Sequence, residues 1–373
     1  MKIGILTVPF NNNYGGYLQA YALMVVLKRM GHQPYMIMRR HNLNDCSKSI
    51  KIKILVKSII KAVLYRDYYI IKHPFEAHYF IQGRKMQNFV RHHLVPQTDF
   101  YYSWNKLEED LRDMFDALVV GSDQVWRSIY VPDIENYYFS FAQHWSVRRI
   151  AYAASFGTIN PEYTEQEKEK CGCLISLFDA VSVREKGALE VFNRFGWNVK
   201  NPSIVLDPTL LLDKTDYDDV IGQQSQQGKR YLFSYVLDND KEKDCVISNI
   251  CKSENMLHLS IANIQDYHTP LLSIEEWLGK IKNAELVITD SFHGMVFSII
   301  FHVPFVVIAN KSRGADRFES LLNRLELLER LAYKPSEVCG ISQKSINWKR
   351  VETLLHKYQI ESIDFLNNCL NPI

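Results

Sequence analysis

The chain has 373 residues, of which 47% are hydrophobic and 23% are charged, a normal globular composition that can bury a sizeable core. A chain of this length is longer than one compact α/β domain of ordinary size, so we expect two domains. Its 44 Lys and Arg nearly balance its 42 Asp and Glu, so the overall charge gives no argument for a nucleic-acid partner, and an anionic ligand must meet local positive charge.

The first half of the chain alternates strand and helix patterns. An apolar strand is predicted at 2–8, a helix at 17–30 that stops at Gly31, and a second strand at 33–39. This βαβ order indicates a parallel sheet. Polar residues follow each later strand, as expected of a doubly wound sheet with its site along one edge. These strands are predicted at 117–120, 149–154, 180–183 and 203–206.

Residues 49–71 differ from this pattern because lysines recur every four residues opposite an apolar stripe. Lys53, Lys57 and Lys61 mark the basic face of this predicted amphipathic helix. Two interpretations are open, one in which the stripe covers the protein's own core and one in which it rests on an anionic bilayer. We favour core packing, because most such stripes face a core.

The second half repeats the strand and helix alternation after a polar linker at 222–229. We predict a first domain over 1–221, a second over 229–335, and a C-terminal helical segment, 336–373, as a candidate to pack back on the first domain. Strands are predicted at 231–237, 256–260, 286–289 and 305–308, and helices at 241–253, 274–283, 294–302 and 346–358.

Cellular location is predicted from what the sequence lacks. The chain opens at once on a strand pattern without the features of a signal peptide, and no stretch long enough to cross a bilayer is free of charge. Its seven cysteines form neither a disulfide framework nor a zinc-ligand spacing, which is typical of reduced thiols. We therefore expect a cytoplasmic protein.

The most informative stretch is 284–294, AELVITDSFHG. A buried strand stops at Asp290 and runs through Ser291 into His293, so an imidazole lies at the carboxyl edge of a sheet beside a carboxylate and a hydroxyl. A helix starting near Gly294 would point its amide groups at the same place, which suits an anion. The alternative is that Asp290 or Ser291 only caps this helix and His293 is a satisfied first-turn residue.

Two clusters in the first half are candidates to bind a sugar, and the amides and phenol of the first suit sugar hydroxyls or a phosphate oxygen. Asn12, Tyr14 and Gln19 follow the first strand, in a loop that is not a dinucleotide-binding fingerprint. Asp123 and Trp126 follow a later strand and bring a carboxylate beside an indole. The alternatives are ordinary turn chemistry for the first cluster, and a helix cap with a core tryptophan for the second.

Three arginines are candidates for an anionic ligand. Arg184 follows a buried strand and can bind a carboxylate or phosphate in bidentate fashion, or form a structural ion pair within its domain. Asn310, Arg313 and Arg317 follow the last strand of the second half and suggest an anion clamp, with a solvated loop as the alternative.

These segments together resemble the polysaccharide pyruvyl transferase family. The likeness runs from about Lys2 to Arg330 and is carried by NNNYGGYLQAYAL, VVGSDQVW, IAYAASFG, VSVRE, VLDPTLLL and ELVITDSFHGMVFSIIFHVPFVVI in this order. The resemblance implies an α/β fold of two Rossmann-like domains facing across a cleft, similar to the glycosyltransferase-B fold. It also implies transfer of pyruvyl from phosphoenolpyruvate to two hydroxyls of one sugar, which gives a cyclic ketal and free phosphate.

The resemblance assigns the family's essential histidine to His293 and a substrate-binding arginine to Arg184. Several members carry arginine where this chain has Ser291, and Arg313 or Arg317 is our candidate to replace it. Asp290 is expected to orient the imidazole, and neither a metal nor a cofactor is expected. Donor contacts are assigned to Arg184, Ser291, Gly294, Asn310, Arg313 and Arg317, and acceptor contacts to Asn12, Tyr14, Gln19, Asp123 and Trp126.

The expected acceptor is a sugar or lipid-linked oligosaccharide on the way to a capsule or exopolysaccharide. A lipid-linked acceptor would allow peripheral contact of the basic helix with the inner face of the membrane. Two alternatives are a nucleotide-sugar-dependent glycosyltransferase on the same architecture and a non-catalytic glycan-binding relative. For the glycosyltransferase, the sequence lacks a convincing acidic residue at a ribose position. Ser291 is the feature that favours the non-catalytic relative.

Overall fold

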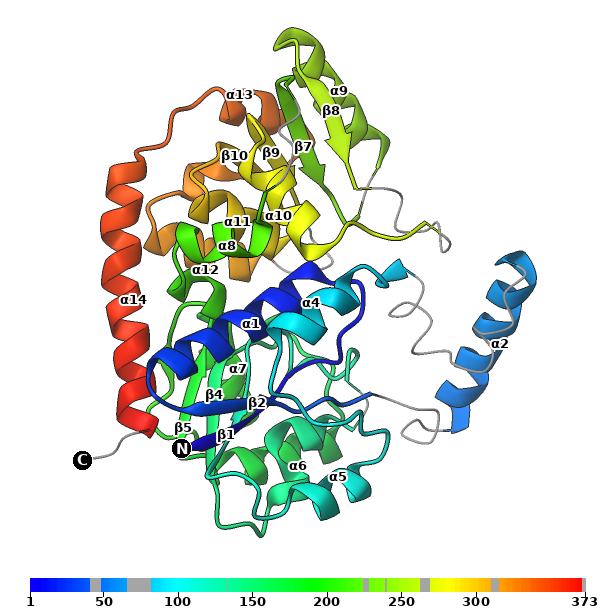
Figure 1. Cartoon of the computed structure of the whole chain (residues 1–373), viewed down its shortest axis with the longest axis vertical. Helices are drawn as coiled ribbons and strands as arrows, with labels where there is room; N and C mark the ends of the chain where they lie inside the picture. Colours follow the sequence, from blue (N-terminus) through cyan, green and yellow to red (C-terminus); the bar gives the residue numbers. More distant parts are fainter. Residues whose placement is uncertain are drawn as a thin grey trace. The chain divides into compact units, whose positions relative to one another are not determined.

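The computed structural model describes residues 1–40, 48–65, 82–131, 133–223, 228–238, 240–261, 269–309 and 315–370. The chain divides into two compact units, each built of helices and a parallel sheet (Figure 1). The first unit comprises Met1–Pro208, Ile264–Leu271 and Asp364–Ile373, and the second comprises Thr209–Asn263 and Leu272–Ile363.

The first unit contains a six-stranded parallel sheet in the order β2-β1-β3-β4-β5-β6. The chain moves outward from β1 in one direction to β2 and in the other to β3, so the topological switch point lies between β1 and β3. Ligands of such sheets bind outside the carboxyl ends of the strands at this point. The strands are β1 (Lys2–Leu6), β2 (Gln33–Met36), β3 (Ala117–Val120), β4 (Arg148–Ala154), β5 (Ala180–Val183) and β6 (Ser203–Ile204).

The helices of the first unit begin and end at recognisable capping residues. Asn13 caps α1, and Thr164 with Glu167 forms a reciprocal capping box on α6. Gly196, in the left-handed region at φ 67°, ends α7. The helices are α1 (Tyr14–Arg29), α2 (Lys48–Tyr65), α4 (Met86–His93), α5 (Trp104–Leu111), α6 (Glu165–Ile175) and α7 (Gly187–Phe195), with 3₁₀ turns η3 (Ile134–Tyr138) and η4 (Ser140–Ala142).

The second unit contains a five-stranded parallel sheet in the order β11-β10-β9-β7-β8. Its switch point lies between β7 and β9, because the chain leaves β7 in one direction to β8 and in the other to β9. The strands are β7 (Tyr231–Tyr235), β8 (Leu257–Ser260), β9 (Leu286–Thr289), β10 (Phe305–Ile308) and β11 (Leu331–Ala332). Strands β7, β9 and β10 are buried throughout, as in a sheet covered on both faces.

The helices of the second unit follow its strands. Asp240, Ser273 and Ser291 cap α9, α10 and α11 with their side chains. The helices are α8 (Lys214–Ile221), α9 (Lys241–Ser253), α10 (Ile274–Lys282), α11 (Phe292–Ile300), α12 (Asp316–Arg324), α13 (Val338–Ser342) and α14 (Trp348–Leu370), with 3₁₀ turns η5 (Pro208–Leu211), η6 (Leu328–Arg330) and η7 (Pro335–Glu337).

The division between the units falls earlier than the predicted end of the first domain at residue 221. Helix α8 belongs to the second unit, where Lys282 of α10 pairs with Asp218 at 2.7 Å and Tyr217 meets Phe297 edge-on at 4.9 Å. The sequence placed the division at the polar linker, whereas packing places it before α8. The last residues of α14 belong to the first unit, where Arg148 Nη1 donates to the carbonyl of Cys369 at 2.9 Å.

The basic segment forms helix α2 (Lys48–Tyr65), and the rest of its predicted range, 66–71, lies outside the described residues. Our favoured interpretation, in which its apolar stripe packs on the core, is wrong for the described helix. Its apolar side chains remain exposed, Ile52 at 63% and Leu64 at 71%. Among the described helices, none combines the length and apolar character that a membrane span requires.

Candidate functional site

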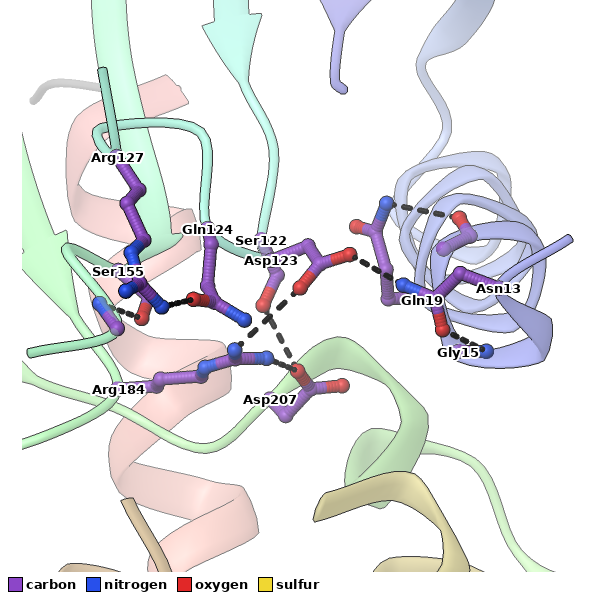
Figure 2. A network of polar contacts seen from close by, with 12 residues as sticks. Asn13, Gly15, Gln19, Ser122, Asp123, Gln124, Arg127, Ser155, Arg184 and Asp207 are labelled. Atoms are coloured by element: carbon purple, nitrogen blue, oxygen red, sulfur yellow. Dashed lines mark hydrogen bonds and ion pairs between the residues drawn. The ribbon is translucent and has the colours of Figure 1, made fainter. Parts of the chain in front are cut away.

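Polar side chains of the first unit meet at the switch point of its sheet. Asn13, which begins α1 after β1, accepts from the Gly15 amide through Oδ1 at 3.2 Å. Its Nδ2 donates to Oδ2 of Asp123, which follows β3, at 3.1 Å (Figure 2). The helix cap thus joins the two loops that flank the switch point, and the N-terminus of α1 faces a carboxylate, as its dipole favours.

Arg184 is buried among carboxyl groups behind these loops. Its Nη1 donates to Asp207 Oδ2 at 2.9 Å, and its Nη2 lies 3.5 Å from Asp123 (Figure 2). Its Nε lies 3.5 Å from Glu185. Burial alone would lower the pKa of the guanidinium, but the carboxyl groups of Asp207, Asp123 and Glu185 raise it overall. These contacts support the ion-pair alternative for Arg184, because an anionic ligand gains little from a guanidinium already opposed by three carboxyl groups.

Asp123 is held in an unusual backbone conformation. Its φ of 75° lies in the left-handed region, which residues other than glycine rarely occupy. Ala153 of the adjacent β4 is also left-handed, at φ 51°, where the register between β4 and β5 shifts. Such strain costs about 1–3 kcal/mol per residue and gathers at sites that position ligands. The contacts of Asp123 with Asn13 and Arg184 offset this cost.

Trp126 is not available to stack on a sugar. The side chain is fully buried, its indole donates to the Tyr137 carbonyl at 3.2 Å, and its ring stacks on Tyr138 with centroids 5.1 Å apart. The core alternative is therefore correct for this residue. An indole two residues beyond a strand-end polar cluster can pack inward, because the chain has already turned back toward the sheet.

Two of the three predicted contacts in the first loop are also structural. Gln19 is fully buried and donates to Thr7 Oγ1 at 2.9 Å and to the Gly16 carbonyl at 3.0 Å, which closes the turn between β1 and α1. Tyr14 is 1% exposed. Asn12 is half-buried and donates to Gln82 at 3.4 Å, so it retains surface toward a ligand.

Several further residues of this cluster follow predicted strands but were not predicted as site residues. Ser122 donates to Asp207 at 2.8 Å, and Gln124 accepts from Arg127 at 3.2 Å (Figure 2). Gly157 is left-handed at φ 71°, and a Cβ there would lie 2.0 Å from Gln124 Oε1. Glycine at this position therefore leaves room for the Gln124 side chain to lie against the backbone of residue 157. The only sign of these residues in the sequence was their position, because each follows a strand within a few residues.

Asp290 holds a loop at the switch point of the second sheet. Its Oδ1 accepts from the Leu237 amide at 2.6 Å, and its Oδ2 accepts from the Asp238 amide at 3.1 Å and lies 3.4 Å from Lys243 Nζ. The carboxylate was predicted to orient the imidazole of His293. Its contacts instead fix the segment after β7, and Lys243, which no sequence pattern singled out, is its charge partner.

The segment between β9 and α11 is held by hydrogen bonds between side-chain hydroxyls and backbone groups. Thr289 Oγ1 donates to the Tyr235 carbonyl at 2.6 Å and accepts from the Ser291 amide at 3.0 Å. Ser291 caps α11 by accepting from the Gly294 amide at 3.5 Å. A Cβ at Gly294 would lie 2.4 Å from Thr289 Oγ1, so glycine is required for packing here. Ser291 thus caps α11, and its predicted donor contact stays a prediction.

His293 lies in the first turn of α11, where it is 5% exposed. Its ring meets Phe292 edge-on with centroids 5.3 Å apart, and Phe292 lies 6.4 Å from Phe318 of α12. Arg317, 6% exposed, places its guanidinium 5.6 Å from the Phe318 ring. Ring contacts of Phe292 and Phe318 therefore connect the imidazole with the guanidinium, after the adjacent parallel strands β9 and β10.

The remaining predicted donor contacts, Asn310 and Arg313, lie outside the described residues. Arg317 is the described member of that cluster, and it occupies the second position of α12. In the second unit the described residues therefore bring together His293, Ser291, Gly294 and Arg317 near the ends of two neighbouring strands. In the first unit they bring together Asn13, Asp123, Arg184 and Asp207.

Comparison with known proteins identifies the family and the fold. The family model described as polysaccharide pyruvyl transferase matches residues 13–312. No curated protein matches the sequence. Similar solved structures have low identity, so the likeness shows the fold alone, and it confirms two Rossmann-like domains of the glycosyltransferase-B-like class.

Three solved structures illustrate this likeness. A putative UDP-N-acetylglucosamine 2-epimerase from Listeria monocytogenes has a TM-score of 0.55 at 11% identity, with 100% of this chain and 91% of that chain covered. The S. aureus MnaA–UDP co-structure has a TM-score of 0.54 at 10% identity, covering 100% and 97%. The UDP-GlcNAc 2-epimerase from Methanocaldococcus jannaschii has a TM-score of 0.53 at 12% identity, covering 97% and 99%.

Proposed function

This chain belongs to the polysaccharide pyruvyl transferase family, and on that premise we propose that it transfers the pyruvyl group of phosphoenolpyruvate to two hydroxyls of one sugar. The sugar is part of a cell-surface polysaccharide or its precursor, and the product is a cyclic ketal. The observation that carries the proposal is the position of His293, in the first turn of a helix at the carboxyl edge of the second sheet.

The reaction needs one group that both gives and takes a proton. A proton added to the methylene carbon, C3, makes C2 of the donor electrophilic, and the first sugar hydroxyl attacks C2 and loses its proton. The bond between C2 and the phosphate oxygen then breaks, the second hydroxyl closes the ring, and its proton leaves with inorganic phosphate. An imidazole can serve as both general acid and general base, so His293 can give the proton to C3 and take the proton of the first hydroxyl.

The second unit supplies the positive potential that a trianionic donor requires. The N-terminus of α11 lies beside His293, and the dipole at such helix ends favours anions. The Arg317 guanidinium lies 5.6 Å from the ring of Phe318, which contacts Phe292. We therefore assign donor binding to Arg317 and the start of α11, with Arg313 as a further candidate, and we assign to Arg184 the task of holding the strand-end loops of the first unit.

The first unit has the chemistry of an acceptor site. Amide and carboxylate groups form the hydrogen bonds that sugar hydroxyls need, and Asn12, Asn13 and Gln124 combine such groups with exposed or half-exposed side chains at the switch point. Asp123 lies behind them and fixes Asn13. The fully buried Trp126 and Gln19 have no part in this assignment.

The experiment that tests the proposal follows the donor carbon. The protein is incubated with phosphoenolpyruvate labelled with ¹³C at C2 and with galactosides, mannosides and N-acetylhexosaminides as acceptors. The proposal predicts a quaternary ketal carbon in the ¹³C spectrum together with release of phosphate in equal amount. Stabilisation in a thermal-shift assay by UDP-N-acetylglucosamine but not by phosphoenolpyruvate, with no ketal from any acceptor, would instead favour nucleotide-sugar chemistry.

A further inference from the structure

Helix α2 (Lys48–Tyr65) exposes a continuous apolar stripe. Its members recur at the spacing of one helical face and are each between 48% and 71% exposed. Soluble proteins rarely leave such a row uncovered, and a row of this kind marks a contact surface. The residues of the stripe are Ile52, Val56, Ile59, Ile60, Val63 and Leu64.

Positive charge borders this stripe on both sides. Lys53 and Lys57 lie along one edge of the helical wheel, and Lys48 lies along the other, and all three are exposed. The helix carries five lysines and no acidic residue. Its surface therefore combines an uncovered apolar row with a flanking charge of one sign.

The opposite face of α2 is different. Ser58 and Ala62 are 4% and 0% exposed, so this face of the helix is covered. The six exposed apolar residues of the stripe lie away from it, whereas Ile54 and Leu55 are half-buried. The exposure of the stripe is therefore a property of one face and not of the whole helix.

We propose that α2 docks on an anionic lipid bilayer, with the stripe among the acyl chains and the lysines at the headgroups. Interfacial helices have this arrangement of one apolar face and a lysine-rich border. A bilayer with anionic headgroups complements both features, since each lysine near such a surface is attracted to it. A second copy of the chain docking through the same face would bring two sets of lysines together, which charge repulsion opposes.

This inference does not depend on which group the enzyme transfers, since it uses only the composition and exposure of α2. Its test is flotation of the full chain with vesicles of phosphatidylcholine alone and with vesicles that also contain phosphatidylglycerol. We expect the chain to float with the anionic vesicles and to remain in the dense fraction with the neutral ones.

Three variants separate the lipid contact from a general charge effect. The K48E/K53E/K57E variant should lose on the order of a hundredfold in partitioning to anionic vesicles. The I52S/V56S/V63S variant should lose binding although it keeps every lysine. The K241E/K344E/K349E variant makes the same change in net charge at exposed lysines of the second unit and should float like the wild type.

A second measurement needs no variant. Amide hydrogen exchange of the wild type should slow across α2 when anionic vesicles are added, with no slowing when neutral vesicles are added. Failure of the wild type to float, or equal loss of flotation in the α2 charge variant and the control variant, would overturn the proposal. A dimer in sedimentation velocity that the serine variant dissolves would assign the stripe to a second copy of the chain and would overturn it too.

Discussion

The rings of Phe292 and Phe318 lie with their centroids 6.4 Å apart and join the first turn of α11 to the first turn of α12. The His293 ring contacts Phe292, and the Arg317 guanidinium lies 5.6 Å from the Phe318 ring. Because β9 and β10 are adjacent and parallel, the helices that follow them start at the same edge of the sheet. The candidate proton-transfer group and a cation are thus connected through one aromatic pair within a single unit.

Arg317→Met is expected to weaken binding of phosphoenolpyruvate. A hydrogen bond to a charged group contributes about 1.5–3 kcal/mol, so the Kd should rise roughly tenfold to a hundredfold. Isothermal titration calorimetry measures this change. The matched control is Arg324→Met, at the far end of the same helix over the Tyr358 ring, which should leave the Kd unchanged. Equal effects of the two variants would remove Arg317 from the donor site.

Arg184→Met is expected to destabilise the first unit, because three buried carboxyl groups lose their common partner. Breaking a buried ion pair costs about 3–5 kcal/mol, and urea unfolding followed by circular dichroism should show a loss of that order. Arg350→Met, which breaks an exposed pair with Glu326 at 2.6 Å, should change the free energy of unfolding far less, because solvent screens this pair. A donor-binding role for Arg184 would appear instead as a raised Kd at unchanged stability.

Gly294→Ala is expected to lower the free energy of unfolding by about 1–3 kcal/mol, because the new Cβ would lie 2.4 Å from Thr289 Oγ1. Gly340→Ala is the control. It lies exposed within α13 with no heavy atom within 4 Å of the new Cβ, so alanine should stabilise the protein by up to about 1 kcal/mol. Differential scanning calorimetry compares the two. An unchanged Tm for Gly294→Ala would mean that the contact with Thr289 is not tight.

Stability should fall as the pH drops below neutrality, in part because of His302. Burial has the largest effect on its pKa and lowers it; Glu352 partly offsets this and Lys214 adds to it. The folded pKa lies below the unfolded value of about 6.5, so the unfolded chain takes up more protons as the pH falls. The contribution of His302 to the free energy of unfolding is fully present above about pH 6.5 and is lost as the pH falls through the folded pKa.

His302→Gln should therefore reduce the dependence of the unfolding free energy on pH in this acid range. Urea unfolding at a series of pH values measures the slope. His356→Gln, an exposed position on α14, serves as the control and should leave the slope as in the wild type. A slope that His302→Gln does not change would show that other groups account for the acid sensitivity.

Much of the fold is predictable from local sequence because its strands are short, apolar and bounded by polar turns. The predicted limits of β3, β5, β9 and β10 coincide with those in the structure. Helix ends were less predictable. Helix α14 runs to Leu370, beyond its predicted end at Tyr358, since its last turn packs with the first unit. A tertiary contact of this kind leaves no local signal.

The candidate site was predictable only in part, for a related reason. Polar residues after strands were expected at the correct edge, but their partners are remote in sequence. Asn13 and Asp123 are 110 residues apart, and Ser122 and Asp207 are 85 apart. The pattern around Gln19 is the same whether its amide faces a ligand or turns back to Thr7, and only the structure distinguishes the two.

The rate of ketal formation by His293→Ala shows whether His293 moves the proton. With ¹³C-labelled phosphoenolpyruvate and an acceptor that the wild type uses, we expect this rate to fall at least roughly a hundredfold. Stabilisation of the variant by phosphoenolpyruvate in a thermal-shift assay should persist, and His356→Ala should turn over like the wild type. A His293→Ala protein that forms the ketal at a rate near that of the wild type would contradict the account.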